Sequence, residues 1–173
     1  MPPNESSVSE RVLSALEGQY LSFTLGSEVF GLPILSVQEI IGLMPVTRVP
    51  RTPDYVRGVI NLRGKVIPVI DLRLKFGMKN EGDTPRTCII VVQVKYDSQT
   101  IVMGFIVDEV SEVLEIGAEQ IEPPPAFGDA VAVEFIVGMG KVGQKVIMLL
   151  DVARILSATE LAETRQLSKE AMA

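Results

Sequence analysis

The stretch that decides the fold is Arg57-Gly-Val-Ile-Asn-Leu-Arg-Gly-Lys-Val-Ile-Pro-Val-Ile-Asp-Leu-Arg73. Its two runs of β-branched and aliphatic residues, 57–61 and 65–70, are typical of β-strands. The Asn-Leu-Arg-Gly segment between them predicts a hairpin loop, because Gly64 is free to adopt positive φ. The sequence therefore predicts a β-hairpin that raises Arg63 into solvent at its tip.

The same pattern returns 80 residues further along the chain, and a second set of residues upstream recurs with an offset of 73. The common order of these matches favours an internal duplication of a unit of about 65–70 residues. In the first set, Gly58, Lys65-Val-Ile and Asp71 reappear as Gly138, Lys145-Val-Ile and Asp151. In the second set, Gly31, Val37 and Glu39 reappear as Gly104, Val110 and Glu112.

Two copies predict a mainly β chain with two similar subdomains, over about residues 19–84 and 85–157, between which strands can cross. Each copy is too small for a large core, so we expect a shared interface. Residues 1–18 are predicted to be a flexible leader, and residues 158–173 a C-terminal helix or tail. The spacing in 34–41 fits a helix and a strand equally. Further predicted strands are 20–25, 29–34, 44–49, 87–96, 100–107, 110–116, 131–137 and 145–150.

Composition excludes several classes of function. The net charge of −6 argues against a general affinity for nucleic acid. The single cysteine, Cys88, permits no internal disulfide and fits a core position in a buried strand. The N-terminus has no signal-peptide pattern, and the longest apolar runs are too short to span a bilayer. A basic stretch from Arg48 to Lys75 is either a solvated face or a docking face for acidic partners.

The residues of the commonest catalytic and zinc-binding arrangements are absent. The chain has no histidine and one cysteine, which excludes Ser-His-Asp and Cys-His arrangements and any ordinary zinc site. The G-x-G-x-x-G match at 138–143 leads into a predicted strand, so it predicts a glycine-rich turn and no dinucleotide site. Asp71 and Asp151 each precede a short helical run and are predicted to be helix N-caps. No catalytic residue, metal or cofactor is predicted.

Two surfaces are candidates for partner binding. Arg63 at the hairpin tip is either an ordinary solvated arginine or a planar, bidentate anchor for a partner carboxylate. The proline-rich segment 42–53 is either an edge with a partner-binding apolar face or a simple connector.

Several motifs together resemble the CheW family. They are the 57–73 segment, Phe30-Gly-Leu-Pro-Ile-Leu-Ser-Val-Gln-Glu-Ile40, Val107-Asp-Glu-Val-Ser-Glu-Val113 and Gly138-Met-Gly140, and the resemblance covers the chain from about Gln19 to Leu156. It implies two five-stranded SH3-like β barrels packed side by side, with short helices. It also implies a non-catalytic adaptor that couples methyl-accepting chemoreceptors to the regulatory domain of the CheA histidine kinase. Such a protein would be cytoplasmic and recruited to membrane-associated receptor arrays.

The resemblance also implies roles for individual residues. Some match positions of receptor coupling or of a groove for the receptor hairpin, and others match a kinase-binding edge. Cys88 stands where an aliphatic residue is expected. The receptor-binding residues are Val37, Glu39, Gly58, Arg63, Cys88, Met103 and Gly104, and the kinase-binding residues are Val46, Arg48 and Arg57.

Three alternatives remain open. The double-barrel fold is shared with the kinase's own regulatory domain, so an excised piece of that kinase would look similar. Some relatives fuse the domain to a receiver domain, for which the 17 residues after Leu156 are too few unless the sequence is a fragment of a longer chain. A β-barrel module that binds a small molecule or an oligonucleotide is the alternative from another class.

Overall fold

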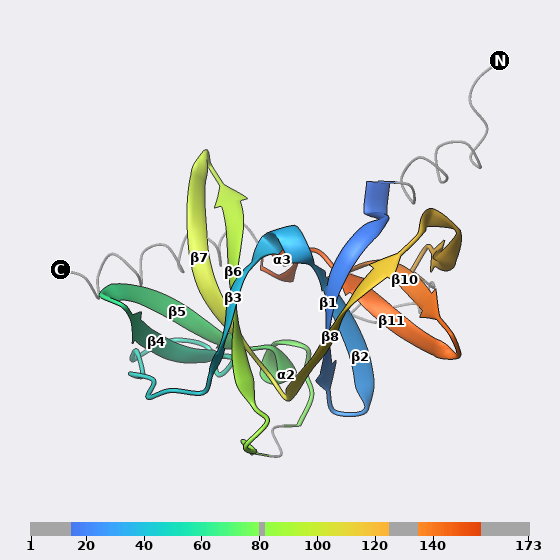
Figure 1. Cartoon of the computed structure of the whole chain (residues 1–173). Coiled ribbons are helices and arrows are strands. Elements are labelled where there is room, and N and C mark those ends of the chain that lie inside the picture. The colour runs from blue at the N-terminus through green and yellow to red at the C-terminus, as the bar shows by residue number, and fades with distance from the viewer. Residues whose placement is uncertain (1–14, 80–81, 125–134, 157–173) are drawn as a thin grey trace.

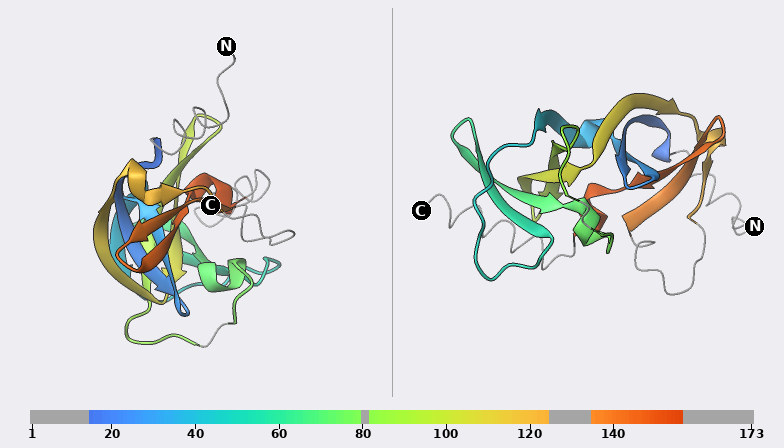
Figure 2. Two further views of the ribbon diagram at one scale, coloured as in Figure 1. Left: turned by 90° about the vertical axis from the view of Figure 1, so that its right-hand side faces the viewer. Right: turned by 90° about the horizontal axis from the view of Figure 1, so that it is seen from below.

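The computed structural model describes residues 15–79, 82–124 and 135–156, and these residues form two β-sheets that lie side by side (Figure 1, Figure 2). The five-stranded sheet has the order β3-β6-β7-β5-β4. Its strands are β3 (Val37–Gly42), β4 (Val56–Leu62), β5 (Lys65–Asp71), β6 (Cys88–Tyr96) and β7 (Gln99–Val107). The mainly β class predicted from the sequence is confirmed.

The other sheet has six strands in the order β8-β1-β2-β11-β10-β9. Its sixth strand, β9, has only two residues, which accounts for the difference from the predicted five strands. The bounds are β1 (Gly18–Leu25), β2 (Glu28–Pro33), β8 (Glu109–Ile116), β9 (Ile121–Glu122), β10 (Ile136–Val142) and β11 (Lys145–Leu150). The short helical elements are η1 (Ile34–Ser36), α2 (Leu72–Lys75), η2 (Ala118–Gln120) and α3 (Val152–Ile155).

The strand pairing repeats with the two offsets found in the sequence. Val69 of β5 pairs in parallel with Gly104 of β7, and Leu149 of β11 pairs in parallel with Gly31 of β2. The β4–β5 ladder shifts register just before Gly58, and the β10–β11 ladder shifts at the same point of the second copy. The two copies therefore share backbone register as well as sequence, as the predicted duplication requires.

Each sheet is built from both copies. The β1–β2 hairpin of the first copy pairs with β8 and β11 of the second, while the β6–β7 hairpin of the second copy pairs with β3 and β5 of the first. The predicted boundary near residue 84 therefore does not separate the two sheets. The reason is physical: adjacency along the chain sets the hairpins, but long-range pairing decides which sheet each hairpin joins.

Three local predictions are corrected. Segment 44–49 forms no strand, because its only ladder contact is an isolated bridge between Thr47 and Val59. Gly138 and Gly140 lie within β10, so the turn is confined to Gly143 and its neighbour. The ambiguous 34–41 segment divides into η1 and then β3.

Some predictions fall outside the described residues. They concern most of the leader 1–18, the first part of the predicted strand 131–137, and the predicted C-terminal helix 158–173. Among the residues that are described, no helix is long and apolar enough to cross a membrane.

The core is aliphatic, with a few phenylalanines at its centre. A central cluster takes residues from both sheets, including Phe23 and Phe30 of the six-stranded sheet and Phe105 of the five-stranded sheet. Two smaller clusters lie within the individual sheets, one around Ile60 and Val91 and the other around Ile116 and Leu149. The shared cluster holds the sheets together, as expected for units that are small on their own.

Candidate functional site

The hairpin tip that carries Arg63 is a strained turn. Leu62 pairs with Lys65, so the loop has two residues, Arg63 and Gly64, with φ of 54° and 88°. Two positive φ values are typical of a type I′ turn, whose first position is unfavourable for a side chain as large as arginine. The Asn61 side-chain oxygen accepts a hydrogen bond from the Gly64 N–H at 2.9 Å, which braces the turn. The Arg63 side chain is 67% exposed.

The second copy makes the corresponding turn without this strain. Gly143 occupies the place of Arg63, with φ of 62°, and Lys141 occupies the place of Asn61. A glycine adopts this conformation at no steric cost. The fold therefore does not require an arginine at the tip. Positive φ also occurs at Arg51 and in the β6–β7 turn, at Asp97 and Ser98, so the difference between the repeats, and not the strain alone, marks Arg63 as a candidate for binding.

Arg63 forms an ion pair with Glu39 of β3, which joins the hairpin tip to the edge of the five-stranded sheet. The hydrogen bond with Glu39 and the charge of that carboxylate raise the pKa of Arg63. Ile40 and Leu43, next to Glu39 along the chain, are exposed apolar residues. We call Glu39, Ile40, Leu43 and Arg63 the tip patch. Its members are an exposed cation, its counter-ion and two exposed apolar residues that follow Glu39 along the chain. Ile40 is adjacent to Glu39 in β3, so their side chains point to opposite faces of the strand.

Three of the predicted receptor-binding residues are buried instead. Met103 is fully buried, so it offers no side-chain surface in this conformation. A Cβ on Gly104 would lie 2.7 Å from Ile89 Cγ2, and one on Gly58, at φ of +142°, would lie 2.1 Å from the Thr47 carbonyl oxygen. These two glycines therefore permit close packing. The predicted groove lined by Met103 and Gly104 is not open here.

Two further predicted receptor-binding residues are partly buried. Val37, on β3, packs against the central core cluster. Cys88 begins β6 and pairs with Gly42 and Val107. Burial is the main cause that raises the pKa of the Cys88 thiol, which agrees with a packing residue.

The predicted kinase-binding residues separate into two groups. Arg48 is exposed, and Val46 packs against the core cluster of the five-stranded sheet. Arg57 is different, because its guanidinium contacts Asp71 at 3.1 Å and Asp83 at 2.5 Å, and its side chain is only 28% exposed. Arg57 is therefore committed to an internal contact, while Val46 and Arg48 remain the candidates for the edge.

Those contacts belong to an ionic cluster that the sequence analysis missed. Its centre is Arg73 of α2, whose side chain is 3% exposed. Arg73 bonds both oxygens of Asp71 and one each of Asp83 and Asp108. With the Gly82 carbonyl oxygen, these acceptors occupy all five guanidinium N–H groups. Arg57, Asp71, Arg73, Asp83 and Asp108 form what we call the ionic cluster.

The cluster changes the interpretation of Asp71. Its carboxylate accepts a hydrogen bond from the Arg73 backbone N–H at 3.0 Å, which confirms the predicted N-cap. Asp151 caps α3 in the same way, through the Ala153 N–H at 2.9 Å. Asp71 alone is also the fully buried partner of two arginines. The hydrogen bond with Asp71 is the main cause that raises the pKa of Arg73.

The amino-acid sequence of this chain is similar to those of known proteins. The family model for the CheW-like domain matches residues 19–160. The chain is 40% identical over 164 residues to the chemotaxis protein CheW of Klebsiella aerogenes, covering 95% of this chain and 96% of that one. It is 35% identical over 144 residues to protein FrzA of Myxococcus xanthus, covering 81% and 86% of the two chains.

A solved structure of a related protein has a similar fold. The crystal structure of the scaffolding protein TtCheW from Thermoanaerobacter tengcongensis superposes with a TM-score of 0.74 at 35% identity, covering 84% of this chain and 97% of that chain. The strand order and the superposition together define a β domain built from two sheets. The chain belongs to the CheW-like family of chemotaxis scaffold proteins.

Proposed function

We propose that this protein is a non-catalytic adaptor that couples methyl-accepting chemoreceptors to the CheA histidine kinase. The observation that carries the proposal is the strained Arg63 turn, which the second copy of the repeat replaces with an unstrained glycine. Membership of a chemotaxis scaffold family supplies the class of partner. The protein would act in the cytoplasm, recruited to membrane-associated receptor arrays.

The receptor face would be centred on the tip patch. The turn that carries Arg63 is braced by Asn61, so little backbone entropy would be lost when the guanidinium pairs with a carboxylate of the receptor tip. Ile40 and Leu43 offer apolar surface beside it. Glu39 would fix the direction of the guanidinium in the free protein. Val37 and Cys88 would support this face from below, and Gly58, Met103 and Gly104 would act through packing.

The kinase would dock on a different face, along the connection that carries Val46 and Arg48. The part of the chain that forms the five-stranded sheet and its connections, described over 37–79 and 82–107, contains ten Lys and Arg residues against five Asp and Glu. The rest of the described chain contains three Lys and Arg against nine Asp and Glu. This basic excess favours acidic surfaces on the partners of that half.

Calorimetric titration tests the proposal with two partners, a soluble fragment of the receptor's cytoplasmic tip and the regulatory domain of the kinase. Arg63→Ala is expected to weaken receptor binding at least tenfold and to leave kinase-domain binding unchanged. Arg86→Ala is the matched control, since Arg86 is also an exposed arginine paired with a carboxylate, Glu109, at 3.5 Å. A folded wild-type protein that binds neither partner would refute the adaptor role.

A further inference from the structure

The chain crosses between the two sheets at two connections that occupy equivalent places in the two repeats. η1 leads from β2 to β3 and contains Leu35, and Asp108 connects β7 to β8. With the offset of 73, Leu35 and Asp108 are equivalent positions. In Figure 1 η1 lies between β1 and the β6–β7 hairpin, while the β7–β8 connection lies lower, beside α2. The two crossings are therefore well separated.

The Asp108 crossing is tied to both sheets. One Asp108 oxygen accepts a hydrogen bond from Arg73 at 3.0 Å, and α2, which carries Arg73, continues from the five-stranded sheet. The other oxygen accepts one from the Gly26 N–H at 2.6 Å, in the β1–β2 turn of the six-stranded sheet. The Asp108 N–H also donates to the Thr24 carbonyl oxygen at 3.1 Å. A single side chain thus bridges the sheets.

Aromatic contacts also join the two sheets at the Asp108 end. Phe76, which follows α2, lies 5.6 Å from Phe30 of β2 and 5.2 Å from Phe135, measured between ring centroids. A hollow of about 580 Å³ lies here, but Arg73 and Asp108 themselves line it and remain bonded. A buried, fully paired arginine resists displacement, because breaking one contact leaves a charge without its partner.

Among the described residues, the Leu35 crossing has no such ionic tie. The residues equivalent to Asp108, Arg73 and Arg57 are Leu35, Ala153 and Val137, none of which is charged. Leu35 is 88% exposed. Its carbonyl oxygen accepts a hydrogen bond from the exposed Gln93 side chain at 3.5 Å, a long contact.

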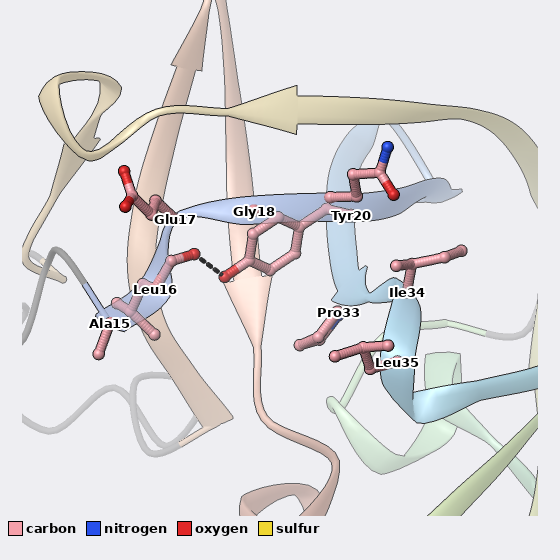
Figure 3. Close-up of a pocket in the computed structure, with 9 residues that line it drawn as sticks. Ala15, Leu16, Glu17, Gly18, Tyr20, Pro33, Ile34 and Leu35 are labelled. Carbon is pink, nitrogen blue, oxygen red and sulfur yellow. Dashed lines mark hydrogen bonds between the residues drawn. The ribbon is translucent and has the colours of Figure 1, made fainter.

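Two hollows flank this crossing. Figure 3 shows the first, of about 380 Å³, with Pro33, Ile34 and Leu35 on one side and Leu16 on the other. The Tyr20 ring lies between them and donates its hydroxyl to the Leu16 carbonyl oxygen at 2.5 Å. The second hollow, of about 230 Å³, lies between Leu35 and the β6–β7 hairpin. The described residues thus leave space on both sides of Leu35.

We propose that the ionic cluster is a fixed pivot between the two sheets, and that the sheets hinge about it at the Leu35 end. The contrast between a saturated ionic contact at one crossing and, among the described residues, no ionic contact at the other carries this inference. It goes beyond the adaptor role and is tested on the protein alone, so it stands or falls independently of partner binding.

Pulsed electron–electron distance measurements between nitroxide labels test the hinge in a Cys88→Val background. One label pair, Gln19→Cys with Lys95→Cys, spans the Leu35 end. A second pair, Ser27→Cys with Arg86→Cys, spans the Asp108 end. All four positions are exposed. The expected result is a broad distance distribution across the Leu35 end and a narrow one across the Asp108 end; equally narrow distributions would overturn the proposal.

Asp108→Asn sharpens the test, because it removes the charge that pairs with Arg73 while keeping an acceptor for the Gly26 N–H. The Asp108-end distribution is expected to broaden in this variant and to remain narrow in the control Asp151→Asn, whose carboxylate only caps a helix. An unchanged width in a folded Asp108→Asn protein would contradict the pivot. If Asp108→Asn does not fold, the widths of the two distance distributions measured with Asp108 in place decide whether the sheets hinge.

Discussion

The two repeats have the same backbone and different ionisable residues. β4–β5 and β10–β11 share register, bulge position and a capped helix after the second strand. The first repeat has Arg63 at its turn, where the second has Gly143. Two arginines of the first repeat, Arg57 and Arg73, surround Asp71, and the equivalent residues of the second repeat are Val137 and Ala153. The fold therefore needs only the shared features, and the features unique to the first repeat are the ones to examine for binding and for coupling of the sheets.

The largest expected difference between the repeats is at the two capping aspartates. Asparagine caps a helix about as well as aspartate, so Asp151→Asn should change the free energy of unfolding by less than about 0.5 kcal/mol. Asp71→Asn removes a buried charge from between two arginines and should cost about 3–5 kcal/mol. Urea unfolding of the two variants measures both values. Equal small effects would show that the ionic cluster adds nothing to the cap.

The next largest difference in stability is expected at the equivalent glycines, Gly58 and Gly138. Gly58→Ala places a Cβ against the Thr47 carbonyl oxygen at a φ that side chains rarely adopt, and should cost about 3 kcal/mol. At Gly138 the nearest atom to such a Cβ is Ile121 Cγ2, at 3.1 Å, and φ is not positive, so Gly138→Ala should cost about 1 kcal/mol. Thermal and urea unfolding distinguish the two. A reversed order would contradict the packing role of Gly58.

The smallest expected effect is a pH dependence at Asp83. Burial alone would raise its pKa, but the hydrogen bonds and charges of Arg73 and Arg57 outweigh burial and lower the pKa below 3.8. A lowered pKa in the folded state contributes stability above the unfolded-state pKa, and this contribution is lost as the pH falls through the folded-state value. Asp83 is partly exposed, so Asp83→Asn should cost only about 0.5 kcal/mol at pH 7.

The cost of Asp83→Asn should persist down to about pH 4 and shrink below it. Unfolding measured from pH 7 to pH 3 checks this, with Asp97→Asn in the β6–β7 turn as the control that is expected to have no such dependence. A cost that grows on acidification would mean that Asp83 does not pair with the two arginines.

Much of the fold could be predicted because its signals are local or periodic. The hairpin around Arg63, the two capping aspartates and the duplication all depend on short spacings that the sequence displays directly. The ionic cluster could not be predicted in this way. Arg73 and Asp108 lie 35 residues apart, and only the β5–β7 pairing and the crossing to β8 bring them together.

The candidate site was predicted in part for the same reason. Arg63 and Glu39 form an ion pair although β3 and the β4–β5 hairpin lie towards opposite edges of the five-stranded sheet, a contact that the sequence pattern does not display. Met103 and Gly104 belong to β7, an inner strand paired on both sides, and most of its residues are buried, so the exposed–buried alternation of a surface strand is lost. Exposure in such a strand cannot be derived from the sequence pattern.

The most direct test of the account is receptor-tip binding by Arg63→Gly, with thermal stability measured on the same samples. The substitution gives the first repeat the turn residue of the second and relieves the positive-φ strain. Arg63→Gly is expected to show an unchanged or higher Tm, at least tenfold weaker receptor binding and unchanged binding to the kinase regulatory domain. Unchanged receptor binding would contradict the claim that the strained turn exists to present Arg63 to a receptor.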